Sequence, residues 1–85
     1  MDKSTIIKEL SRKISRDIIG QPDKFINDQE SLISSGLIDS FNLVDLALIV
    51  EDSYGVRIED YELNADAFDN INELAQLIIE KQNHS

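Results

Sequence analysis

The sequence predicts an all-α fold: a small four-helix bundle with three main helices, one short helix and a long first loop. Three stretches of the chain place apolar residues at intervals of three and four, the period of an amphipathic helix, and none shows the alternation of a strand. The chain has 3 glycines and 1 proline, so loops do not dominate it. At 85 residues one hydrophobic core is only just sufficient, so we expect residues 1–85 to form a single domain.

The first helix is expected over about residues 3 to 19. Ile7, Leu10 and Ile14 are spaced three and four, and Ile18 continues the stripe. Gly20 can adopt the left-handed conformation that ends a helix, and the following proline prevents its continuation.

A long connection, residues 20–39, separates the first helix from the second. Helix connections in bundles usually have about two to eight residues, so a longer one either carries a function or joins helices across the length of the domain. Its apolar residues are expected to fold back on the core: Phe25, Ile26, Leu32, Ile33, Leu37 and Ile38.

The second helix should begin at Asp39 or Ser40 and end at Tyr54, where Gly55 can supply a left-handed cap. One stripe is expected to face the core: Leu43, Leu46, Ala47, Val50 and Tyr54. Val44 and Leu48 fall instead on a neighbouring face, beside Ser40. This helix is therefore either central to the bundle or partly a binding surface.

Two further helical segments follow. The stretch EDYEL, residues 59–63, can form one short turn. The last helix should begin at Asn70, because Asn70 and Glu73 form a variant of the capping box and the apolar residues from Ile71 onward have helical spacing.

The charge is unevenly distributed. The net charge is −9, and residues 25–80 contain thirteen acids but only one cation, Arg57, whereas residues 1–24 contain six cations and four acids. Such a surface repels nucleic acid and anionic membranes and attracts a basic protein surface, unless the acids serve only solubility. The longest apolar run, LALIV, is too short to span a membrane, and the N-terminus has no apolar signal-peptide region. We expect a cytoplasmic monomer.

The composition argues against an enzyme. There is no cysteine, and the lone histidine, His84, is expected in a solvated tail, so most pairings of a nucleophile with a base are excluded. Glu51 and Asp52 are neighbours on a helix and point about 100° apart, which favours a solvated acidic face over a catalytic pair. The aromatic residues Tyr54, Tyr61 and Phe68 are interpreted as core anchors.

Ser40 raises a separate question, because Asp39 alone can cap the second helix. If Asp39 is the cap, Ser40 is the first helical residue and its hydroxyl is not needed for capping. A phosphate ester there would gain from the helix dipole and from free backbone N–H groups. Capping of the helix by Ser40 itself is the alternative. The residues alone therefore allow an attachment site at Ser40 but do not decide between attachment and capping.

The stretch GLIDSFNLVDLALIVEDSYGVRI, residues 36–58, resembles the signature of the acyl carrier protein family. The shared features are a glycine-containing loop, Asp-Ser followed by an apolar residue, an acidic helix, and an aromatic residue followed by Gly-Val-x-Ile. The resemblance covers nearly the whole chain. Asn42 and Glu59 depart from the fatty-acid carriers, which usually have an acid and a proline there, and the stretch LNADAFDNINELAQLI is closer to stand-alone carriers of amino-acid or specialised-metabolite pathways.

The resemblance implies that Ser40 carries a 4′-phosphopantetheine arm, attached from coenzyme A by a separate phosphopantetheinyl transferase. The thiol of the arm would hold an acyl or aminoacyl group as a thioester, delivered by a loading enzyme and taken by downstream acyl-transfer enzymes. Asp39 would orient the transferase chemistry. By position, the partner-binding residues would be the acids Asp45, Glu51 and Asp52 and the apolar residues Phe41, Val44 and Leu48.

The main alternative is an unmodified helical interaction module that uses the same acidic and apolar surface to bind a basic partner.

Overall fold

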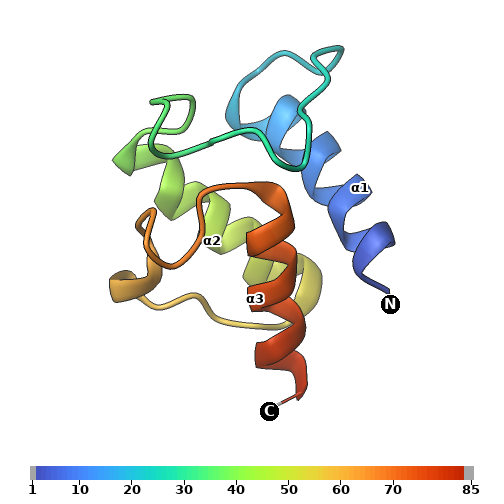
Figure 1. Cartoon of the computed structure of the whole chain (residues 1–85), viewed down its shortest axis with the longest axis vertical. Coiled ribbons are helices and arrows are strands. Elements are labelled where there is room, and N and C mark those ends of the chain that lie inside the picture. Colours follow the sequence, from blue (N-terminus) through green and yellow to red (C-terminus); the bar gives the residue numbers. More distant parts are fainter. Residues whose placement is uncertain (1, 84–85) are drawn as a thin grey trace.

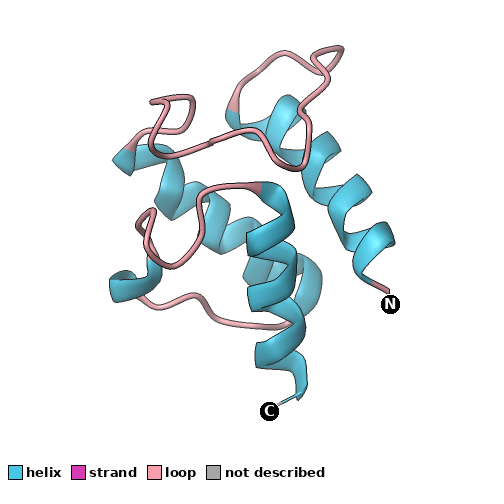
Figure 2. Cartoon of the chain, in the orientation of Figure 1, coloured by secondary structure: helices cyan, strands magenta, loops and turns pink. Residues whose placement is uncertain are grey.

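The computed structural model describes residues 2–83, and they form an all-α fold without strands (Figures 1 and 2). His84, which was expected in a solvated tail, lies outside the described residues. The elements in order are α1 (Lys3–Lys13), the π-helical turn η1 (Ile14–Ile18), α2 (Ser40–Tyr54), the 3₁₀ turn η2 (Asp60–Glu62) and α3 (Ile71–Asn83). The predicted three main helices, short helix and long first loop are confirmed. Each helix within residues 2–83 is too short or too polar to cross a bilayer.

The first helix ends differently from its prediction. An α-helix was expected to about residue 19, but the last turn widens to π geometry, with Ile19 N–H donating to the Ile14 carbonyl at 2.9 Å. The wide turn includes Ser15, which is 1% exposed and donates from Oγ to the Lys24 carbonyl at 2.8 Å. The returning loop thus binds this turn, and Gly20 ends it with a φ of 75°.

Helices and loop share one hydrophobic core. α1 packs against α3, and η1 packs against α2. The loop contributes Ile26, Leu32 and Ile38, which are almost fully buried as expected. Phe25 was expected in the core as well, but it is 79% exposed, because its neighbour Ile26 takes the inward position in this irregular segment.

The loop is fastened to the start of α3. The Asp69 carboxylate accepts from the backbone N–H groups of Ser34 at 2.9 Å and Ile33 at 2.8 Å, and from the Ser31 hydroxyl at 3.0 Å. These hydrogen bonds, the one with Ser34 first, lower the pKa of Asp69 to about 2. Leu32 N–H donates to the Asp69 carbonyl at 2.7 Å. The second half of the loop is therefore held in place where it leads into α2.

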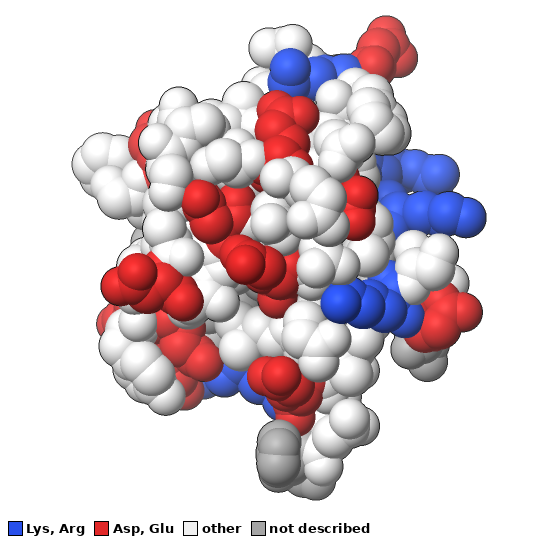
Figure 3. All heavy atoms as spheres, viewed as in Figure 1, with Lys and Arg blue, Asp and Glu red and all other residues white. Residues whose placement is uncertain are grey.

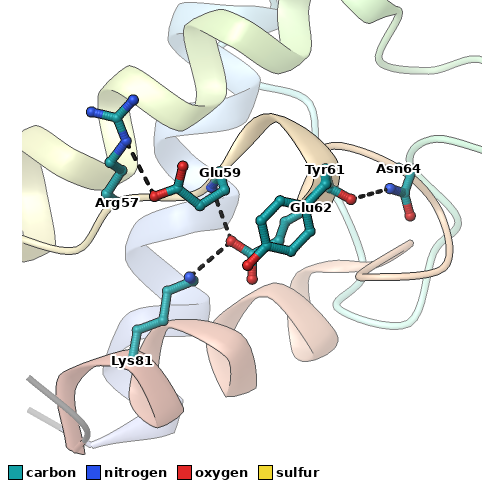
Figure 4. A network of polar contacts seen from close by, with 6 residues as sticks. All are labelled: Arg57, Glu59, Tyr61, Glu62, Asn64 and Lys81. Atoms are coloured by element: carbon teal, nitrogen blue, oxygen red, sulfur yellow. Dashed lines mark hydrogen bonds and ion pairs between the residues drawn. The ribbon is translucent and has the colours of Figure 1, made fainter.

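The segment after α2 leads to η2, which is tied to α3. Gly55 ends α2 with a φ of 68°, as predicted. Figure 4 shows how η2 is held: the Glu62 carboxylate accepts from Lys81 Nζ at 2.8 Å and from Glu59 N–H at 2.9 Å. Burial raises the pKa of Glu62, but these two hydrogen bonds lower it by more, so the net pKa is below its ordinary value.

Two of the three aromatic anchors were predicted correctly. Phe68 is fully buried, and Tyr54 is half-buried with its hydroxyl donating to Glu9 at 2.9 Å. Tyr61 was wrongly predicted as core: it is 76% exposed, because η2 turns Glu62 toward Lys81 and leaves the tyrosine ring in solvent (Figure 4).

Candidate functional site

The candidate site begins where the long loop becomes α2. Asp39 is the N-cap residue, with extended backbone geometry, and its Oδ1 accepts from Asn42 N–H at 2.9 Å. Ser40 is the first helical residue and is exposed, and its hydroxyl makes no hydrogen bond within residues 2–83. Asp39 therefore supplies the cap, and the Ser40 hydroxyl is not used for it.

The electrostatics of this helix end favour a negative group on Ser40. Leu43 N–H donates to the Asp39 carbonyl at 3.0 Å, which is the first backbone bond of the helix. The amide groups of Ser40 and Phe41 precede that bond and have no acceptor within the helix. Free amide groups and the aligned peptide dipoles make a helix start attractive to phosphate. The donor set thus fits a phosphodiester on the Ser40 hydroxyl.

An apolar strip adjoins this position. Phe41 is 84% exposed, Val44 is 54% exposed and Leu48 is 60% exposed, whereas Leu43 and Leu46 on the other side of α2 are buried. Exposed residues of this size on successive turns of one helix are unusual on a surface without a partner.

All the predicted site residues of α2 share one face. At about 100° per residue, Ser40, Phe41, Val44, Asp45, Leu48, Glu51 and Asp52 fall within an arc of about 140° around the helix axis. The buried residues Leu43, Leu46 and Val50 occupy the opposite arc. At about 1.5 Å per residue, the face extends about 16 Å from Ser40 to Glu51. We call this exposed arc of α2 the docking face.

The acids of the docking face are solvated. Asp45, Glu51 and Asp52 are all exposed. Figure 3 shows acidic side chains spread across the centre and left of the molecule, whereas most visible basic side chains lie along the edge that contains α1. The docking face therefore combines apolar contact area with negative charge.

Sequence reasoning missed a hollow beside the docking face. It measures about 210 Å³ and lies between α2 and the segment that includes η2. Val44 and Leu48 border it from α2, and Arg57, Ile58 and Leu63 border it from the other side. Ile58 is 5% exposed, but no periodicity in residues 56–63 indicated that these side chains face α2.

The acidic side chains of the described residues do not gather into a metal site or a catalytic pair. Among residues 2–83, no group of three or more His, Cys, Asp or Glu side chains could hold a metal ion. Glu51 and Asp52 lie on the exposed face of the helix, as expected of a solvated pair.

The comparison with protein families identifies the class. Residues 9–78 match the family model described as phosphopantetheine attachment site. This match spans most of the chain, so the chain belongs to that family. It is a carrier protein without catalytic activity of its own, and its cofactor is phosphopantetheine.

A solved structure supports the fold. The acyl carrier protein from Thermotoga maritima superposes with a TM-score of 0.75, covering 99% of this chain and 94% of that one, at 20% sequence identity. A search of curated proteins gives no match.

Proposed function

We propose that Ser40 carries the 4′-phosphopantetheine arm, and that the chain presents acyl or aminoacyl groups, held on that arm as thioesters, to partner enzymes. The observation that carries this proposal is the free, exposed Ser40 hydroxyl at the start of α2, where Asp39 already supplies the cap.

The attachment step uses coenzyme A and a phosphopantetheinyl transferase. The Ser40 oxygen attacks the phosphoryl group that bears pantetheine, a phosphorus–oxygen bond forms, and the nucleotide half of coenzyme A leaves. The serine proton passes to a base of the transferase, and Asp39, next to the nucleophile, orients this chemistry. Because the chain has no cysteine, the thiol of the arm is the only thiol that can hold the cargo.

The docking face supplies the contact with partners. Asp45, Glu51 and Asp52 attract basic residues on the transferase, the loading enzyme and the acyl-transfer enzymes, and raise the rate of encounter. Phe41, Val44 and Leu48 then bury apolar area against each partner.

Other serines fit an attachment role less well. The hydroxyls of Ser11, Ser15, Ser31 and Ser35 are all engaged in hydrogen bonds. Ser53 lies at the carboxyl end of α2, where the dipole disfavours a phosphate. Ser4 is the instructive comparison: it is exposed in the first turn of α1 behind the cap Asp2, but no large exposed apolar residue lies on α1.

The test is the intact mass of the protein after incubation with coenzyme A and a broad-specificity transferase. We expect the gain of one phosphopantetheine group in the unaltered protein and in Ser4→Ala, and no gain in Ser40→Ala. Circular dichroism should show that both variants are folded. A gain that persists in Ser40→Ala, or no gain in the folded unaltered protein, would contradict the proposal; the second result is the one that an unmodified interaction module predicts.

A further inference from the structure

A groove on the side of α1 away from the docking face has features of a second binding surface. It measures about 460 Å³ and lies between α1 and the first part of the long loop. These segments lie on the opposite side of the molecule from the start of α2 (Figure 1). None of the residues that line the groove belongs to α2.

The groove presents an aromatic ring that the fold holds outward. The Ser15 hydroxyl donates to the Lys24 carbonyl at 2.8 Å, and the Ser11 hydroxyl donates to the Ile26 carbonyl at 3.2 Å. Ile26 is 2% exposed, whereas Phe25 between these two fixed residues is 79% exposed. The exposure of Phe25 therefore follows from an anchored backbone and not from a loose loop tip.

The cations of the groove are available to a ligand. Lys8, Arg12 and Lys24 line it, and their side chains make no hydrogen bond or ion pair within residues 2–83. Asp23 and Asp28 also line it, so three cations face two acids and the groove is net positive in a chain whose net charge is −9. Arg12 also borders an adjoining hollow lined by Glu9, Lys13 and Arg16, and Arg16 is paired there with Asp17 at 2.9 Å, so Lys13 adds one further cation beside the groove.

We propose that this groove binds an acidic segment of a partner protein, with an apolar side chain packed on Phe25 and carboxylates on Lys8, Arg12 and Lys24. Charge complementarity selects an anionic occupant, and the apolar lining from Phe25, with Ile7 and Pro22, selects one that also has apolar side chains. An extended polyanion such as nucleic acid fits less well, because the acids elsewhere on this small molecule repel it beyond the groove. A partner bound here leaves the Ser40 side of the molecule open, so the two surfaces can be occupied together.

The test uses a fluorescein-labelled peptide of alternating glutamate and leucine residues, titrated with the full chain. Fluorescence anisotropy gives the affinity, and amide chemical shifts of the labelled protein give the location. We expect saturable binding that weakens as salt rises, with shifts at residues 7–12 and 22–28. Phe25→Ser, and Lys8→Gln combined with Arg12→Gln, should each weaken binding by about tenfold, as expected for loss of an anchor residue.

The matched control is Phe41→Ser, which removes an equally exposed phenylalanine from the docking face and should leave peptide affinity unchanged. Absence of saturable binding would overturn the proposal, as would shifts confined to α2 or equal binding of a peptide with glutamine in place of glutamate. Binding of single-stranded DNA or of phosphatidylglycerol vesicles to the groove, without binding of the peptide, would also overturn the proposal. Because each measurement uses the unmodified chain, its outcome is independent of whether Ser40 carries the arm.

Discussion

Asp39 and Ser40 are neighbours at the start of α2, but their substitutions should affect stability very differently. Asp39→Ala removes the side chain that accepts from Asn42 N–H, and loss of an N-cap costs about 1 kcal/mol in the free energy of unfolding. For a domain of this size, 1 kcal/mol lowers the melting temperature by about 4 to 8 °C. Ser40→Ala removes a hydroxyl that has no hydrogen-bond partner among residues 2–83 and introduces a better helix former, so the unfolding free energy should change by no more than about 0.5 kcal/mol.

Urea denaturation at neutral pH, followed by circular dichroism, measures both changes. Asp39→Asn is the matched control, because asparagine caps helices about as well as aspartate and should leave the unfolding free energy nearly unchanged. A loss in Ser40→Ala as large as that in Asp39→Ala would show that the Ser40 hydroxyl is bonded in the folded chain. The assignment of separate roles to the two residues would then be wrong.

Three further predictions concern the core, the loop and the docking face. Phe68→Ala should lower the free energy of unfolding by about 3 to 5 kcal/mol, because it empties a fully buried aromatic site. In a domain of ordinary stability, about 5 to 15 kcal/mol, this loss should lower the urea midpoint steeply. An unchanged midpoint would contradict the burial of Phe68 in the core. The pKa of Asp69 is lowered from 3.8 to about 2, so the hydrogen bonds to its carboxylate should stabilise the fold fully above pH 3.8 and should be lost as the pH falls toward 2. Asp69→Asn should therefore make the unfolding free energy less dependent on pH between these values. An unfolding free energy that falls with pH as steeply in Asp69→Asn as in the unaltered protein would refute this. The double variant Phe41→Ser with Leu48→Ser should change the unfolding free energy by no more than about 0.5 kcal/mol, because both side chains are exposed. It should slow the transfer of the arm by the transferase, measured as the rate of mass gain. An unchanged rate would show that these two side chains do not contact the transferase.

The sequence predicted the helices because their signals are local. The spacing of apolar residues gave three helices, and Asp39 and Gly55 gave the two ends of α2. The sequence left two candidates for the cap, Asp39 and Ser40, and the structure assigns it to Asp39, whose side chain accepts from Asn42 N–H. The bounds of α2 therefore agree with the expectation to within a residue.

What the sequence did not predict depends on contacts between distant residues. The wide turn at η1 is bonded to the loop through the Ser15 hydroxyl and the Lys24 carbonyl. The hydrogen bond from Ile33 N–H to the Asp69 carboxylate joins residues that are 36 positions apart in the sequence. The exposure of Phe25 and Tyr61 could not be predicted, because irregular segments have no period from which to sort apolar side chains into buried and exposed. The groove on α1 was missed for the same reason: its cations were visible in the sequence, but the ring that they border was placed in the core.

The most direct test of the account locates the modification on the chain. The protein is incubated with coenzyme A and the transferase and digested, and each fragment is sequenced by tandem mass spectrometry. The account predicts one phosphopantetheine group per chain, on the side chain of Ser40. A group found on any other serine, or a folded chain that the transferase leaves unmodified, would contradict it.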